Sequence, residues 1–368
     1  MNNYINHHSE EQKSFQTIFA YIIKKGKVTR REIQRDTQYS WGSVSSVVSL
    51  LIEKKYVIET ETIHKEVGRG TAFIVPNGKK YVSIGVDINA IGFSMDVIGI
   101  DGNRKHSESF PNEENTKEYI TRMLFKAIDN GLEFAKNKFE VISIGVSCQG
   151  RVINHEIFDL YPFGKEAYNL NIKELVENKY KIFTYVDHDT NCFLEDYRFN
   201  HDSGKPVTCI ARVVSGIGFS ISTINGMFND TFPIDFGHMI VQPIDGALCI
   251  CGRRGCLEAY SSSTGIINRA GVNKFSIIDQ NRNKYRKYLD DAAFYLGIAA
   301  INIERTFDPG EIVFTGDVLN NDPEFFTKLV NTFNERKYYD TTEIKYISDL
   351  SASYGVARLA FQAKIIKL

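Results

Sequence analysis

The chain lacks several features that would by themselves assign it to a class of proteins. Its 368 residues carry a formal net charge of only −1, so no general excess of basic residues announces a nucleic-acid-binding protein. No apolar run approaches the length that spans a membrane, and residues 1–8 lack the basic and then apolar order of a signal peptide. These absences argue against membrane association, and we expect a cytoplasmic protein.

What the sequence does contain is enough apolar material for more than one core. Hydrophobic residues make up 43 % of the chain, and its length predicts two or three domains. Charge is distributed unevenly, because residues 1–78 hold 11 Lys and Arg against 8 Asp and Glu. This asymmetry is a mild indication that the N-terminal part contacts DNA.

Cysteine is scarce, yet half of the six cysteines fall within eight residues on a glycine-containing loop. One imidazole and three thiolates suit a closed tetrahedral Zn²⁺ site with no position left for a catalytic water. Arg253 and Arg254 lie beside the thiols, and we expect them to lower the thiol pKa values. Scattered core cysteines are the alternative, since free cysteine is often buried. The density of the cluster favours a structural zinc site in a reducing compartment. The candidate ligands are His238, Cys249, Cys251 and Cys256.

The N-terminal part begins with helical patterns. Apolar side chains recur at helical spacing over residues 15–23, and Gly26 follows near the expected end of that helix. Thr29 can cap a second helix over residues 30–36, with Glu32 as its capping-box partner. Two helices in close succession are therefore predicted.

A third helix and a β-ribbon complete this pattern. Ser40 can cap the third helix, and two short strands over residues 57–62 and 71–75 flank a turn at 68–70. The buried stripe expected for the helix is Val44, Val47, Val48, Leu51 and Ile52. Three helices followed by a ribbon are the order of a winged helix-turn-helix. We therefore expect a DNA-binding domain over residues 1–76, a hinge over 77–80 and a second domain over 81–368.

The polar face of the third helix and three arginines are the candidate DNA contacts. Small hydroxyl side chains allow close approach to the major groove. Arginines at the start of the second helix can hold phosphate, and an arginine at the wing tip can enter a minor groove. A small helical domain that contacts protein is the alternative. The residues are Arg30, Arg31, Trp41, Ser43, Ser45, Ser46 and Arg69.

The body contains one pattern twice. Each copy has two strands, a hairpin turn, a long helix and a further strand, and Asp-Gly or Asn-Gly marks each hairpin turn. The first copy has strands over 81–86 and 93–100, a helix near 116–136 and a strand over 141–146. The second has strands over 207–214 and 219–224, a helix near 284–306 and a strand over 312–315. Two α/β halves with ligand bound between them are the predicted architecture.

The histidine and cysteine spacing, His-x10-Cys-x-Cys-Gly-x-x-Gly-Cys-x-Glu, is similar to the signature of the ROK family of bacterial sugar kinases and sugar-responsive repressors. The match runs from about Tyr81 to near the C-terminus. The resemblance implies a two-lobed ribonuclease H-like (actin/hexokinase-type) body with lobes of about 81–190 and 191–350, and a C-terminal helix returning to the first lobe. The N-terminal segment, including its Thr-Arg-Arg-Glu-Ile run, resembles that of ROK repressors, whereas ROK kinases lack such a domain.

The resemblance also implies sugar contacts. Family members carry Asn-Asp-Ala-Asn where this chain has His188-Asp189-Thr190-Asn191, and their aspartate binds a sugar hydroxyl. In the kinases that aspartate is also the general base, so Asp189 stands at a vestigial base position; helix capping is its alternative role. The motif match selects Asp189 and Asn191, and Gly150 is the residue retained from another sugar-side loop of the family. Beside the zinc ligands, the carboxylates of Asp235 and Glu258 and the second ring nitrogen of His238 are further candidate sugar contacts. The family usually has Glu at the position of Asp235.

The phosphate loops depart from the kinase pattern. ROK kinases have Asp-x-Gly-Gly-Thr where this chain has Asp87–Ile91, without both glycines and the hydroxyl. The second loop matches residues 214–220, where Phe219 adds bulk, and Thr315-Gly316-Asp317 lacks one glycine of the third. We therefore expect no enzyme activity but a sugar-responsive DNA-binding regulator that represses carbohydrate-use genes. The expected partners are operator DNA, a monosaccharide or sugar phosphate, and further copies in a homodimer or dimer of dimers. An active kinase with an appended DNA-binding domain, or a regulator that binds DNA constitutively, are the alternatives.

Overall fold

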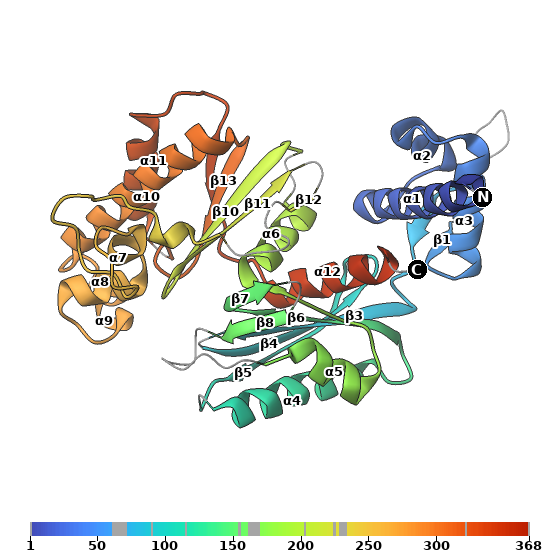
Figure 1. The fold of residues 1–368 in the computed structure, drawn as a ribbon, viewed down its shortest axis with the longest axis horizontal. Coiled ribbons are helices and arrows are strands. Elements are labelled where there is room, and N and C mark those ends of the chain that lie inside the picture. Colours follow the sequence, from blue (N-terminus) through green and yellow to red (C-terminus); the bar gives the residue numbers. More distant parts are fainter. Residues whose placement is uncertain are drawn as a thin grey trace. The chain divides into compact units, whose positions relative to one another are not determined.

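The computed structural model describes residues 2–366 apart from 61–71, 90, 115, 154–155, 161–169, 202–203, 224–225, 228–233 and 321 (Figure 1). The chain divides into two compact units. The first unit comprises Met1–Cys192 with Ala352–Leu368, and the second comprises Phe193–Ser351. Within the described residues, no helix combines the length and apolar content that a membrane span requires.

The N-terminal part has the predicted three helices and ribbon. They are α1 (Asn2–Lys25), α2 (Arg30–Thr37), α3 (Trp41–Glu53) and the antiparallel strands β1 (Val57–Glu59) and β2 (Ile74–Pro76). The capping box is confirmed, because the Thr29 side chain accepts from Glu32 N at 3.2 Å and the Glu32 carboxylate accepts from Thr29 N at 2.8 Å. Ser40 caps α3 by accepting from Ser43 N at 3.1 Å. The predicted turn at 68–70, with Arg69, lies outside the described residues.

Helix α12 (Ala352–Ile366) joins this N-terminal part to the body by side-chain packing. The rings of Phe19 on α1 and Phe361 on α12 lie 5.8 Å apart, nearly perpendicular at 75°. The Tyr81 hydroxyl donates to Lys54 O at 2.9 Å. Residues 77–80, expected as a hinge, form a hydrogen-bonded turn, and the Asn77 side chain donates to Lys55 O at 3.0 Å. The N-terminal helices are thus held by a shared apolar core as well as by the connecting chain.

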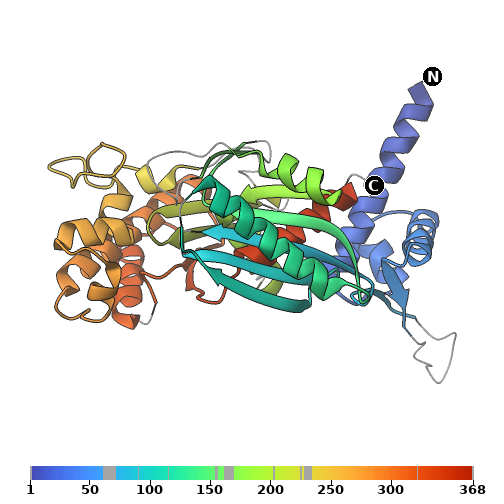
Figure 2. The same ribbon diagram turned by 90° about the horizontal axis from the view of Figure 1, so that it is seen from below.

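The first unit contains a five-stranded sheet in the order β5-β4-β3-β6-β9. Its strands are β3 (Tyr81–Asn89), β4 (Gly92–Gly99), β5 (Arg104–Pro111), β6 (Glu140–Cys148) and β9 (Thr184–His188). Strands β3, β6 and β9 are parallel, while β4 and β5 are antiparallel additions. Helices α4 (Lys117–Ala135) and α5 (Ile172–Tyr180) cover one face and α12 covers the other (Figures 1 and 2). A small ribbon of β7 (Gly150–Ile153) and β8 (Glu156–Leu160) follows β6.

Two glycines allow α12 to approach the sheet closely. A Cβ at Gly85 on β3 would lie 1.9 Å from Ser353 O, and one at Gly145 on β6 would lie 2.3 Å from Val356 O. No side chain fits at those distances, so the sheet carries glycine where the helix crosses it.

The second unit repeats the plan with a sheet in the order β12-β11-β10-β13-β14. Its strands are β10 (Val207–Val213), β11 (Ile217–Thr223), β12 (Gly226–Met227), β13 (Glu311–Thr315) and β14 (Glu343–Tyr346). Strands β10 and β11 form the antiparallel pair and β13 runs parallel to β10, as β3, β4 and β6 do in the first unit. Helix α6 (Asp189–Asn200) begins in the first unit and continues into the second. The other helices are α7 (Leu257–Ser261), α8 (Ser263–Ala270), α9 (Phe275–Asp279), α10 (Arg286–Phe307) and α11 (Pro323–Asn334). The predicted internal repeat is therefore present, although Asn225 of the second hairpin turn lies outside the described residues.

Candidate functional site

The cysteine loop brings the four predicted metal ligands together. His238 ends a short 3₁₀ helix (η2, Phe236–His238), and Cys256 immediately precedes α7. All four ligand atoms lie within 4.8 Å of one another. Gly255 has a φ of 80°, and a Cβ there would lie 1.9 Å from Gln242 O, so the turn between the ligands requires glycine.

The ligand spacing fits a tetrahedral zinc ion. With Zn–S bonds of about 2.3 Å, two sulfurs of a tetrahedron are about 3.8 Å apart. The Sγ atoms of Cys251 and Cys256 are 3.7 Å apart, and His238 Nδ1 is 3.7 Å from Cys249 Sγ. The residues present therefore match both the donor set and the size of a structural zinc site.

The thiols of this cluster differ in acidity. Burial and contacts with the neighbouring thiols raise the pKa of Cys256 to about 12. Burial also acts to raise the pKa of Cys251, but a hydrogen bond from the Arg253 backbone, the other thiols and the Arg253 charge outweigh it, so this pKa is lowered. The expected effect of Arg253 is thus present at one thiol, whereas Arg254 donates to Gly246 O at 3.2 Å.

Glu258 lies beside the zinc loop and reaches the second glycine turn. It is buried on α7, and its carboxylate accepts from Ile217 N at 3.1 Å. A Cβ at Gly216 or at Gly237 would lie 3.0 Å from Glu258 Oε2, so both glycines make room for this carboxylate. Burial raises the pKa of Glu258, the charge of His238 opposes that rise, and the charge of exposed Asp235 adds to it. The structure therefore brings Asp235, His238 and Glu258 into one group.

A second group lies at the carboxyl ends of β3, β6 and β9. Asp189 is the first residue of α6, and its buried carboxylate is 3.1 Å from His188 Nδ1. The Asn191 side chain donates to Asp187 Oδ1 at 2.8 Å. Asp87, at the end of β3, accepts from the Ser147 hydroxyl at 2.7 Å. Sequence reasoning selected Asp189 and Asn191 but missed Asp187 as a candidate, although it is the last buried residue of β9, directly before them.

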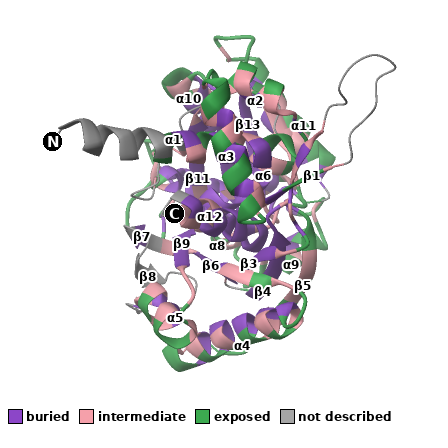
Figure 3. Cartoon of the chain, turned by 90° about the vertical axis from the view of Figure 1, so that its right-hand side faces the viewer, coloured by how far each residue is buried: buried purple, intermediate pink, exposed green. Residues whose placement is uncertain are grey.

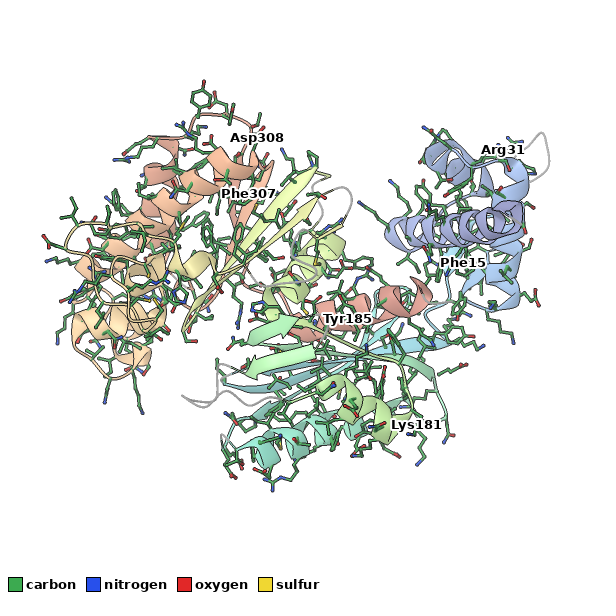
Figure 4. All side chains as sticks on the ribbon, viewed as in Figure 1. Phe15, Arg31, Lys181, Tyr185, Phe307 and Asp308 are labelled. Carbon is green, nitrogen blue, oxygen red and sulfur yellow. The ribbon has the colours of Figure 1, made fainter. Side chains whose placement is uncertain are left out.

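Asp187 accepts hydrogen bonds from the side chains of Asn191 and Tyr185 and from a backbone amide. Besides Asn191, the Tyr185 hydroxyl donates to it at 2.9 Å and His188 N at 2.7 Å (Tyr185 is labelled in Figure 4). The negative field of this group is evident nearby, because burial and then the charges of Asp189, Asp87 and Asp187 raise the pKa of the Cys148 thiol. Gly150 follows with a φ of 149°, a conformation that side-chain-bearing residues rarely adopt.

Three backbone amides in the two phosphate-type loops are bound by the chain's own side chains. The Asn89 side-chain oxygen accepts from Ile91 N at 2.9 Å and Gly92 N at 3.2 Å, while its amide donates to Asp87. In the second loop, Ile217 N donates to Glu258. A bound phosphate needs such amides as donors. These three amides are therefore already paired with protein oxygens.

The expectation for Phe219 is wrong. Its ring is buried in the core of the second unit and stacks on Phe236 with centroids 4.4 Å apart. It lies on β11 with its side chain turned into this core, so it does not occupy space that a nucleotide would need. The paired loop amides, and not this ring, therefore oppose nucleotide binding.

The candidate DNA contacts lie mostly at the surface of α2 and α3. Trp41, Ser46 and Arg31 are exposed, whereas Ser43 and Ser45 are half-buried. Figure 3 colours α2 and α3 by burial, and Figure 4 labels Arg31. The predicted stripe of α3 is inside, since Val44, Val47, Val48 and Leu51 are buried and Ile52 packs against them. Arg30 forms an ion pair with Glu59 on β1. The structure thus gives α3 one apolar inner side and one hydroxyl-bearing outer side.

Comparisons with known proteins agree with this architecture. A family model described as the ROK family matches residues 83–362. The xylose repressor of Bacillus spizizenii is 23 % identical over 329 residues, covering 86 % of this chain and 85 % of that protein. The DNA-binding transcriptional dual regulator NagC of Escherichia coli K12 is 23 % identical over 338 residues, covering 91 % of this chain and 81 % of that protein.

The solved structures show the fold. The crystal structure of a ROK family transcriptional regulator, a homologue of the E. coli MLC protein, matches with a TM-score of 0.81 at 17 % identity and covers 97 % of both chains. Enzymes are also among the relatives, since the glucokinase of Halalkalibacterium halodurans is 24 % identical over 317 residues, with 77 % of this chain and 92 % of that protein covered. The expected α/β fold, an N-terminal helical domain followed by a two-lobed body, is confirmed.

Proposed function

The chain belongs to the ROK family, and we propose that it is a sugar-responsive DNA-binding transcriptional regulator that represses carbohydrate-use genes. One observation carries the proposal: the three helices and ribbon of a winged helix-turn-helix are packed onto a ROK body whose phosphate-type loops are closed by Asn89 and Glu258. Relatives that match over both parts are named xylose repressor and transcriptional dual regulator. Each half of the chain thus supports the same function.

For DNA binding, we assign α3 to the major groove and the exposed start of α2 to phosphate. Arg31 is exposed there, and Arg30, beside it, is paired with Glu59. Arg69 is assigned to a minor groove from its place in the sequence. Because a helix-turn-helix reads one short half-site, we propose that a homodimer or dimer of dimers binds two-fold-related half-sites.

For sugar binding, Asp189 is the central residue of the first unit. A carboxylate can accept hydrogen bonds from two sugar hydroxyls, and Asn191 and Gly150 lie on the adjoining segments. Asp235, His238 and Glu258 are the corresponding candidates in the second unit. The buried carboxylates of Asp87, Asp187 and Asp189 repel an added phosphate, so a neutral monosaccharide fits this group better than its phosphate ester.

We propose that zinc is a structural part of the second unit. His238 Nδ1 and the thiolates of Cys249, Cys251 and Cys256 would hold it, and the metal would supply a cross-link within the loop rather than chemistry at a substrate. The loop also holds Glu258 two residues after Cys256, so the metal would stabilise the position of a sugar-contacting carboxylate.

An active sugar kinase is the second candidate, favoured by the glucokinase relative and by the retained Asp189. It needs amides free to surround the ATP phosphates. Asn89 and Glu258 bind those amides here, and the matching loop lacks both glycines and the hydroxyl of the kinases. We therefore propose that the chain is not an enzyme.

The proposal is tested with the full chain loaded with zinc. Duplexes selected from a random DNA pool supply the operator, and a panel of monosaccharides and their phosphate esters is titrated for release or strengthening of binding. The Asp189→Asn variant keeps the side-chain shape but accepts fewer hydroxyl protons, so it is expected to bind operator normally and to lose the sugar response. Asp129→Asn is the matched control, because Asp129 is on α4 and pairs with Lys179 and Tyr180 away from these loops.

Three outcomes separate the candidates. If no duplex is selected, the chain is not a DNA-binding regulator. If DNA binds but no sugar alters binding, the chain binds DNA constitutively. If Asp189→Asn and wild type respond at the same sugar concentration, Asp189 is not part of the sensing site.

A further inference from the structure

Trp41 is the only tryptophan in the chain, and it stands on the outer side of α3. Its side chain is 48 % exposed, in contrast to Val44, Val48 and Leu51 of the same helix, which are 0 % exposed. About half of the surface of Trp41 thus remains open to solvent, and this half of a large aromatic side chain is available to whatever α3 binds.

The N-cap of α3 and its buried face together place Trp41 on the outer side of the helix. Ser40 caps α3 and sets where it begins, through the bond from Ser43 N at 3.1 Å. The buried valines set the rotation of α3, because they pack into the core that includes α1. Trp41 is the first residue of α3, and in a helix-turn-helix the N-terminal residues of the recognition helix are the ones that reach base edges.

The remaining outer residues of α3 restrict what the helix can read. Gly42, Ser46, Ser49 and Leu50 are exposed, and from Trp41 to Ile52 the helix has no charged side chain and no carboxamide. Guanidinium and ammonium groups select guanine, carboxamides select adenine, and carboxylates select cytosine. Serine hydroxyls bond to more than one base. The base feature left for an apolar side chain is the 5-methyl group of thymine.

We propose that Trp41 selects thymine in the operator by packing its ring against the 5-methyl group in the major groove. The inference rests on the proposed function and specifies it further, because it names the base that α3 distinguishes. Arginine contacts to phosphate hold the domain on any duplex, whereas Trp41 discriminates between sequences.

The test removes one methyl group at a time. In a duplex selected from a random pool by the full-length protein, each thymine is replaced in turn by deoxyuracil, which leaves the Watson–Crick pairing unchanged. We expect one thymine per half-site at which the replacement weakens binding about fourfold, the equivalent of about 0.8 kcal/mol for one buried methyl group. The Trp41→Ala protein is expected to bind thymine and uracil at that position with affinities within a factor of about 1.5.

Controls separate the ring from the helix. Leu50→Ala, which shortens the exposed apolar residue nine positions further along α3, is expected to keep the wild-type preference for thymine. Trp41→Phe retains an apolar ring and is expected to keep part of it. Because Trp41 is the only tryptophan, its fluorescence in the wild-type protein reports directly on the site and is expected to change on duplex binding.

The outcomes distinguish this inference from the function on which it rests. If no duplex is selected, the proposed function fails and the inference with it. If duplexes are selected but no uracil replacement changes affinity, or if Trp41→Ala is as sensitive as wild type, the thymine contact is refuted and the regulator remains. Thermal melting of each variant checks folding, and a Trp41→Ala protein that fails to fold leaves Trp41→Phe and the wild-type uracil scan to decide.

Discussion

Replacing Phe361 by alanine should loosen the N-terminal helices from the body without unfolding the body. Phe361 is 4 % exposed on α12, and its ring meets Phe19 of α1 edge-on at 5.8 Å. Truncating a buried phenylalanine costs about 3–5 kcal/mol, of which about 0.5–1.5 kcal/mol belongs to the aromatic pair. Because α1 and α12 share this core, we expect the lost free energy to weaken the packing of α1 against α12.

The assay is hydrogen exchange of the full-length protein followed by mass spectrometry. A loss of about 3 kcal/mol raises the exchange rate of amides that open with this attachment roughly a hundredfold. We expect that increase in α1 around Ile18–Ile23, with little change in β3 and β6. Phe361→Leu, which keeps most of the volume, is expected to show a much smaller effect.

Val356→Ala is the matched control on the same helix. Val356 is fully buried where α12 crosses β6, and its truncation costs about 1.6 kcal/mol for two methyl groups. Its faster exchange should appear in the sheet instead of α1. If α1 exchanges at the wild-type rate in Phe361→Ala, or if both variants change the same segments equally, the shared core is not the attachment we describe. The sugar response of Phe361→Ala gives a second measurement. We expect it to be reduced if the attachment transmits ligand binding to the DNA-binding helices, and to be intact if it does not.

Three further predictions concern the body. Metal-replete protein should contain about one zinc per chain and Cys251→Ser should lose it, since each ligand is needed to complete the tetrahedron; elemental analysis that finds no zinc would contradict the assignment. A coupled assay with ATP across common hexoses and pentoses should show no turnover, and a rate of even about 1 s⁻¹, at the low end for kinases, would favour the kinase instead. Burial acts against ionisation of Asp322, but Arg286, Phe325 N and Arg282 hold its pKa at about 2, so its ion pairs stabilise the fold above about pH 4 and lose that effect as the pH falls towards 2. The difference in urea midpoint between wild type and Asp322→Asn should therefore shrink over that range, and a constant difference would refute it.

Local signals in the sequence were sufficient to predict the helices and strands that have strong caps or clear apolar periodicity. Thr29, Glu32 and Ser40 marked helix starts that the structure reproduces, because capping depends on residues only three positions apart. The first helix begins at Asn2 rather than near Phe15, since its early turns carry no apolar stripe to announce them. Strands β5 and β14 were not anticipated, and both are sheet-edge strands with mostly exposed or half-buried side chains.

In the candidate site too, features within one short segment could be predicted, whereas contacts between distant residues could not. The four metal ligands could be selected from spacing because they lie in one short segment. The hydrogen bond from Ile217 N to Glu258 could not be predicted from spacing, since it joins residues 41 positions apart and depends on how α7 packs. Phe219 was misassigned for a related reason: its position in a loop-like motif did not reveal that β11 turns its ring into the core. Pairings of this kind are set by tertiary packing, which no short pattern records.

The glycine-lined contact between α12 and the first sheet has a consequence for biosynthesis. The ribosome completes the five strands of that sheet by His188, yet the helix that covers their second face begins only at Ala352. Residues 193–351 must be translated in between, which takes roughly 10–30 s at about 5–20 residues per second. During that interval α12 does not yet cover β3 and β6 around Gly85 and Gly145, and Phe19 lacks its contact with Phe361. A nascent chain therefore acquires the complete core beneath its DNA-binding helices only after the second unit has been synthesised, so translation that stops early yields no fully assembled regulator to compete for operators.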